Sequence, residues 1–284
     1  MAGRTALIYS EGYQRYQFNP THPFNPLRWR LTWELLADLK VLEQVEVHEP
    51  AAASDRELAL VHDEDYLRRV KDWSAKLAAG ENLEATAELQ AYGFSPAGDN
   101  PPFAGMHAAA ALIVGGTLLA GELIVSGRVE HAVNLAGGLH HAQPSRASGF
   151  CIYNDAAVLI RKLRWLGLRV AYVDLDAHHC DGVQQIFDRD PGVLTFSVHE
   201  DGRFLFPGTG QRRERGSGPA AGTKWNFPLP PYAGDAAFLA VIEERLPAVL
   251  AEFRPDVLIS QHGCDGHAAD PLTHLEYSMR SFLR

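Results

Sequence analysis

The feature of this sequence that most constrains its fold is the alternation of short apolar runs with amphipathic segments. Runs of strand length lie at 5–10, 45–49, 131–136, 170–173, 192–200 and 256–260. Helical patterns lie between them, including 27–42, 58–73, 108–124, 155–167 and 235–253. This βα rhythm predicts an α/β fold with a mostly parallel central sheet and helices on both faces.

The chain has no internal repeat and no composition shift that would mark a linker. A length of 284 residues with 46% hydrophobic content is enough to bury one large core. The Gly- and Pro-rich stretch 91–106 is typical of a long loop. We therefore expect a single domain over 1–284.

Charge and hydropathy argue against nucleic acid and membrane partners. The net charge is −9, and the basic run 211–218, which contains Arg212, Arg213 and Arg215, is flanked by glycine and predicts a solvated loop without a role. The apolar stretch 108–121 is shorter than a bilayer crossing and predicts a buried helix. The N-terminal MAGRTALIYS predicts a first strand rather than a secretory signal, so we expect a cytoplasmic protein.

Ionisable residues are concentrated where three predicted strands end. The segment DLDAHHCDG, 174–182, follows the apolar run VAYV. In an extended chain Asp174, Asp176 and His178 share one face, and Asp265, after another strand, can add a further ligand. These donors suit a catalytic zinc or ferrous ion. The alternative for each single aspartate is a helix cap or an arginine partner.

Several motifs in order give the chain a resemblance to the histone deacetylase family, in particular to its bacterial acetoin-utilisation branch. The similarity runs from about residue 8 to the end. Its motifs are HPFNPLRWRLTWELL, GGLHHAQPSRASGFCIYND, DLDAHHCDGVQQIF, FSVHEDGRFLFPGTG and QHGCDGHAADPL. The resemblance implies an arginase/deacetylase-like fold.

The resemblance also implies the residues of a metal-dependent hydrolase. Asp176, His178 and Asp265 match the ligands of a zinc ion, for which Fe²⁺ is the alternative, and His140 and His141 match the proton-transfer pair. A Lewis acid beside a neutral imidazole is the combination that amide hydrolysis needs.

Further positions carry implied supporting roles. Asp174 and Asp181 match carboxylates that orient the histidines. Ser197, with the backbone of Asp174 and His178, resembles a structural potassium site.

The resemblance places an acyl-lysine in a narrow apolar tunnel. Phe150 and Phe206 match its walls, Gly149 leaves room between the rings and offers its carbonyl, and Asp99 matches a carboxylate at the rim. The alternative for an isolated phenylalanine is ordinary core packing.

The sequence departs from the family pattern in two respects. Cys180 stands where glycine is usual, and Cys264 stands where an aromatic residue is common; with Cys151 they form an odd set without a CxxC pair, for which we expect reduced thiols. The family's C-terminal tyrosine, which stabilises the oxyanion, has no counterpart before Arg284. We therefore expect this chain to be C-terminally incomplete.

The function expected from these observations is removal of acetyl or similar acyl groups from lysine side chains of proteins or peptides. Three alternatives stay open. They are an arginase-like enzyme, because DAHHCD partly matches a DAHxD pattern, an acetylpolyamine hydrolase, and an acyl-lysine-binding protein without turnover. The sequence leaves the oligomeric state open.

Overall fold

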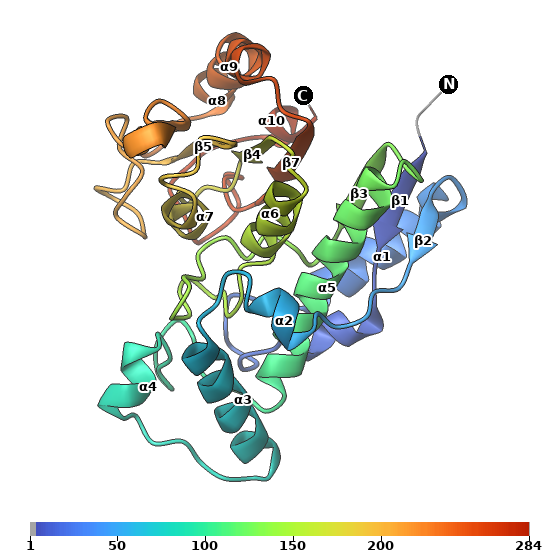
Figure 1. The fold of residues 1–284 in the computed structure, drawn as a ribbon, viewed down its shortest axis with the longest axis vertical. Helices are drawn as coiled ribbons and strands as arrows, with labels where there is room; N and C mark the ends of the chain where they lie inside the picture. The colour runs from blue at the N-terminus through green and yellow to red at the C-terminus, as the bar shows by residue number, and fades with distance from the viewer. Residues whose placement is uncertain (1–3, 284) are drawn as a thin grey trace. The chain divides into compact units, whose positions relative to one another are not determined.

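The computed structural model describes residues 4–283 and forms two compact units, Met1–Leu159 and Ile160–Arg284 (Figure 1). The boundary lies within helix α6 (Asp155–Trp165). Each unit contains one sheet, and all strand pairs are parallel. This confirms the predicted α/β class, whereas the single domain stays a prediction.

The first unit contains a three-stranded sheet in the order β2-β1-β3. The expected first strand is β1, and Met1, Ala2 and Gly3 lie outside the described residues. The elements of this unit before α6 are, in chain order, β1 (Thr5–Ile8), η1 (Glu11–Arg15), α1 (Leu27–Asp38), η2 (Val41–Glu43), β2 (Glu46–His48), α2 (Asp55–Leu58), α3 (Glu64–Ala78), α4 (Ala87–Ala91), α5 (Met106–Val125) and β3 (His131–Asn134).

Helix α5 is the central helix of this unit and packs against β1 and β3. With 20 residues it is longer than expected, and by length and composition it could cross a membrane. However, 67% of its most apolar stretch is buried inside the protein, as in a core helix. Gly116 lets Tyr13 and Asn134 approach, since a Cβ there would lie 2.2 Å from the Tyr13 hydroxyl. That hydroxyl donates to Asn134 Oδ1 at 2.9 Å. Close packing therefore outweighs the low helix propensity of glycine.

The second unit contains a four-stranded sheet in the order β6-β5-β4-β7. Its elements after α6 are, in chain order, β4 (Val170–Asp174), α7 (Asp181–Ile186), β5 (Val193–Glu200), η3 (Gly218–Ala220), β6 (Lys224–Leu229), α8 (Asp235–Glu244), α9 (Leu246–Phe253), β7 (Val257–Gln261) and α10 (Met279–Phe282).

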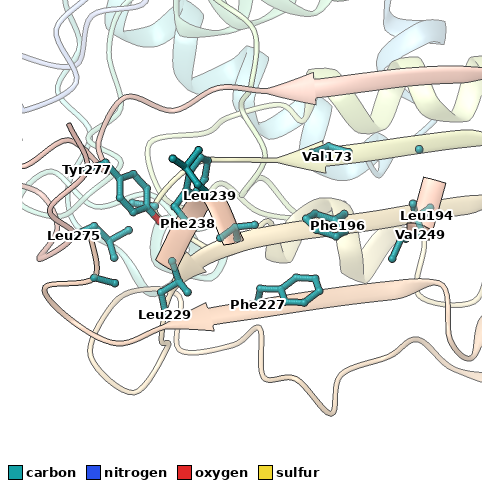
Figure 2. Close-up of a cluster of buried hydrophobic side chains, with 14 of the residues drawn as sticks. Val173, Leu194, Phe196, Phe227, Leu229, Phe238, Leu239, Val249, Leu275 and Tyr277 are labelled. Atoms are coloured by element: carbon teal, nitrogen blue, oxygen red, sulfur yellow. The ribbon is translucent and has the colours of Figure 1, made fainter. Parts of the chain in front are cut away.

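Strands β4 and β5 are buried along their whole length, as expected for central strands covered on both faces. Alternate residues such as Val173 and Phe196 pack with side chains of α8 and α9, among them Phe238 and Val249 (Figure 2). Helix α7 lies on the opposite side of the sheet from α8 and α9 (Figure 1).

Proline bears on two of the differences from the sequence prediction. Strand β6 was not predicted; its Pro228 removes a hydrogen-bond donor, which is tolerated because β6 lies at the sheet edge. The helix predicted over 235–253 is split into α8 and α9, with Pro247 in the first turn of α9. Proline fits that first turn but not a helix interior.

Candidate metal centre

The centre forms where parallel strands of the second unit end at one edge of the sheet. Strand β4 pairs with β5 on one side and with β7 on the other, so that Asp174 stands beside Ser197 and Gln261. The loops that follow β4 and β7 therefore leave the sheet side by side. The loop after β4 carries Asp176 and His178, and the loop after β7 carries Asp265.

Asp176, His178 and Asp265 offer one ligand atom each, and these atoms all lie within 4.8 Å of one another. His178 Nδ1 is 3.0 Å from Asp176 Oδ1 and 2.8 Å from Asp265 Oδ2. Two carboxylate oxygens and one imidazole nitrogen suit zinc or ferrous iron. The donor set thus fits the expected metal.

Neighbouring groups hold both carboxylates in place. Asp176 Oδ1 accepts the His178 backbone N–H at 2.8 Å, and Asp176 Oδ2 accepts the Gln261 side-chain amide at 3.1 Å. Asp265 Oδ1 accepts the Ala177 backbone N–H at 3.0 Å. A Cβ on Gly263 would lie 2.1 Å from Asp176 Oδ2. Glycine at 263 is therefore required for this approach.

The electrostatics of the cluster favour a cation. Burial lowers the pKa of His178, but the hydrogen bonds and charges of Asp176 and Asp265 outweigh it and raise this pKa to about 10. Burial and the charge of Asp176 raise the pKa of Asp265 to about 6. Two crowded carboxylates thus attract positive charge, which a metal ion supplies more strongly than a proton.

Asp174 is not a member of the ligand set, which corrects the expected alignment of 174, 176 and 178 on one face. The β-strand ends at Asp174, so the two-residue alternation stops there. The fully buried Asp174 carboxylate instead accepts the Tyr172 hydroxyl at 2.7 Å and the Asp176 backbone N–H at 3.1 Å. It supports the loop that carries the ligands.

The loop after β5 brings Phe206 to the centre. Its ring centroid lies 6.3 Å from that of His178, and the side chain is 41% exposed. Two buried histidines that sequence reasoning missed fix this loop: His179 Nδ1 lies 2.8 Å from Thr209 Oγ1, and His199 Nε2 lies 2.9 Å from the Gly210 carbonyl. The adjacent pair His178–His179 was the sequence signal for the first, and the second lies in the motif FSVHEDGRFLFPGTG.

His140 and His141 are both buried in the first unit, and their Nε2 atoms are 3.0 Å apart. The dipeptide Asn154–Asp155 holds their loop. Asn154 Nδ2 donates to the His140 carbonyl at 3.1 Å, and the Asp155 carboxylate accepts the backbone N–H groups of Gly138 and Leu139. Sequence reasoning missed this role, although ND follows the tandem histidines in the same motif.

Phe150 lies in the first unit with a left-handed backbone, φ 68°, directly after Gly149 at φ 50°. A bulky residue rarely adopts this conformation, which is found where function or packing imposes it. The Tyr16 hydroxyl donates to the Phe150 carbonyl at 2.7 Å, and the Cys151 thiol lies 3.2 Å from the Gly149 carbonyl.

Asp99 is linked to Phe150 through His22. Its backbone carbonyl is 3.2 Å from His22 Nε2, and the His22 ring stands edge-on to Phe150 with centroids 4.7 Å apart. The structure thus brings Asp99, His22 and Phe150 together. His22 was not predicted as a site residue.

The remaining predicted roles stay predictions. Asp181 begins α7 in the second unit, and the histidines that it was expected to orient with Asp174 lie in the first. Ser197 Oγ lies 2.7 Å from His199 Nδ1. The potassium site at Ser197 stays a prediction. Cys151 and Cys180 are buried, whereas Cys264 is exposed, and the expected reduced thiols stay a prediction.

Comparison with known proteins gives a consistent result. Residues 22–284 match the family described as the histone deacetylase domain. The acetoin utilization protein AcuC of Bacillus subtilis (strain 168) is 47% identical over 279 residues, which cover 98% of this chain and 70% of that protein. AcuC of Staphylococcus aureus (strain MSSA476) is 42% identical over 281 residues, 99% of this chain and 70% of that protein.

A solved structure is also similar. The crystal structure of an HDAC homolog from Aquifex aeolicus superposes with a TM-score of 0.87 at 32% sequence identity. The match covers 99% of this chain and 74% of that one.

Proposed function

Because the chain belongs to the histone deacetylase domain family, we propose that it is a metal-dependent hydrolase that removes acetyl or similar acyl groups from lysine side chains. The substrate is an acylated protein or peptide. The observation that carries this proposal is the cluster of Asp176, His178 and Asp265, whose ligand atoms lie within 4.8 Å of one another.

These three residues would hold Zn²⁺, or Fe²⁺ in its place. When bound, the ion supplies a Lewis acid that polarises an amide carbonyl and acidifies a water molecule. Gln261 and the backbone of Ala177 and His178 keep the carboxylates aimed at the ion. Potassium near Ser197 is a proposed structural ion only.

Proton transfer falls to the tandem histidines. His141 acts as the general base toward water, and His140 shares the proton, since their Nε2 atoms lie 3.0 Å apart. The Asp155 carboxylate and the Asn154 amide position the loop backbone at 138–142.

The acyl-lysine stem would lie against apolar surface. Phe206 beside His178 and, in the first unit, Phe150 after Gly149 are the aromatic residues proposed to contact it. Asp99 would receive the peptide backbone at the rim. We further propose a cytoplasmic location and no nucleic-acid or membrane partner.

The proposal is tested with metal-reconstituted protein and a panel of acyl-lysine peptides, acetylpolyamines and arginine. Release of acetate from the peptides supports it, with Asp265→Ala as the inactive control. Urea release from arginine with two metal ions per chain would support the arginase-like alternative. Tight peptide binding without turnover at full metal occupancy would support a binding protein. A preference for acetylpolyamines over peptides would support a hydrolase of small molecules.

A further inference from the structure

A cavity of about 480 Å³ opens in the second unit, beside the loop that follows β5. Three arginines give it a basic lining, together with one acid, two prolines and loop backbone. Its lining residues are Asp201, Gly202, Arg203, Gly210, Gln211, Arg212, Arg213, Pro228 and Pro230. The basic run that the sequence predicted to be a solvated loop thus lines a cavity.

The acid in the cavity is already neutralised. The Arg203 guanidinium binds Asp201 with Nε 3.1 Å from both carboxylate oxygens and a terminal nitrogen 2.6 Å from Oδ2. The nearby Glu214 carboxylate accepts the backbone N–H groups of Gly210 and Gln211, at 3.1 and 3.0 Å. Asp201 is therefore neutralised by Arg203, whereas Glu214 keeps its charge and is held by backbone N–H groups.

Arg212 and Arg213 are exposed, and neither forms a salt bridge within residues 4–283. The next arginine, Arg215, is fixed by its position 3.7 Å above the centroid of the Trp225 ring. The cavity thus offers two guanidinium groups that form no salt bridge within residues 4–283, although the Glu214 carboxylate lies in the same loop. Guanidinium groups bind carboxylates in a bidentate manner.

The same loop reaches the metal centre. It carries Phe206 beside His178, and contacts of its residues Thr209 and Gly210 with His179 and His199 hold it against the strand ends. Arg203, which lines the cavity, is three residues from Phe206, so the Cα atoms of these two residues are at most about 10 Å apart. An extended peptide with its lysine beside Phe206 can therefore reach this cavity with a neighbouring side chain.

We propose that this cavity binds the carboxylate of an Asp or Glu side chain close to the acyl-lysine, so that the protein prefers acidic peptide segments. This inference rests on the proposed function for the identity of the peptide. The positive charge of Arg212 and Arg213 would attract the carboxylate and so favour acidic over neutral peptides.

The experiment measures binding of fluorescent nine-residue peptides at low ionic strength, by anisotropy, with metal-loaded protein. The peptides carry a central acetyl-lysine and either Glu or Gln two and three residues on each side; a third, acidic peptide carries glutamine in place of acetyl-lysine. We expect the acidic acetylated peptide to bind about tenfold more tightly than its Gln counterpart. The preference disappears in Arg212→Gln/Arg213→Gln and weakens with added salt.

The matched control is Arg254→Gln/Arg280→Gln, which removes the same charge from exposed positions of the same unit and keeps the preference. Equal binding of acidic and neutral peptides by the wild type, or an equal loss in both double variants, would refute the proposal. Displacement of the acidic peptide by micromolar inorganic phosphate would instead identify a small-anion site and also refute it. The third peptide has no acetyl-lysine and therefore reports on the cavity alone. If it binds in an acid-dependent manner while the acetylated peptides release no acetate, only the proposed function is rejected.

Discussion

Oδ2 of Asp265 lies 2.8 Å from Nδ1 of His178, although the two residues follow different strands. Parallel pairing of β4 with β7, in the register Asp174 to Gln261, brings their loops together. The sheet therefore brings the two loops together, and hydrogen bonds within the loops hold the ligand carboxylates. Substitutions at the ligands should change metal binding without unfolding the strands.

We expect Asp176→Ala to bind Zn²⁺ at least about 100-fold more weakly than the wild type, because it loses one of three protein ligands. Elemental analysis after dialysis checks this result. Glu252→Ala, an exposed substitution in the same unit, should retain the metal. Stoichiometric zinc in purified Asp176→Ala would remove Asp176 from the ligand set.

Gly263→Ala should weaken metal binding by about 10- to 100-fold with little loss of folding, because the new methyl group must displace the Asp176 carboxylate. Titration with a competing chelator measures the affinity. Gly234→Ala is the matched control, since its Cβ would have ordinary contact, 3.4 Å from the Glu276 carbonyl. Equal affinities in the two variants would show that Asp176 can move without cost.

His141→Ala should keep the metal and bind acyl-lysine peptide normally, while turnover falls by about 100-fold or more, because it loses the general base. Metal content and kcat are measured on the same preparation. If His141→Ala loses zinc while Asp265→Ala retains it, the assigned roles of base and ligand are reversed.

The sequence predicted the candidate metal cluster because its residues follow strongly apolar strands whose ends meet in a parallel sheet. Asp176, His178 and Asp265 lie together as the resemblance implied. The spacing of an extended chain wrongly placed Asp174 on one face with Asp176 and His178. Strand β4 ends at Asp174, so the alternation of side chains does not continue beyond it.

Supporting residues were harder to predict because they act through contacts between distant segments. Nothing local to Gly263 shows that Asp176 lies against it, and nothing near Asp155 shows that it accepts N–H groups from Gly138 and Leu139. The basic run at 211–218 is a loop with exposed Arg212 and Arg213, as predicted, but the cavity that it lines was not predicted. The other lining residues lie earlier in the same loop, such as Asp201, or at the end of β6, such as Pro228 and Pro230.

The last prediction concerns pH and His62, which is buried in the first unit. Its Nε2 accepts the Asn154 backbone N–H at 2.9 Å, and its Nδ1 lies 3.1 Å from the Gln143 carbonyl, so the neutral ring fits and a second proton would oppose an N–H group. Burial lowers its pKa to about 4, against 6.5 in the unfolded chain. Between these values the unfolded state binds more protons, so stability falls as pH decreases below 6.5. From pH 7 to 5 this single group should cost the wild type about 2 kcal/mol in urea unfolding. The loss should be absent in His62→Gln and unchanged in the exposed His131→Gln. An identical pH dependence in all three proteins would show that His62 does not control acid stability.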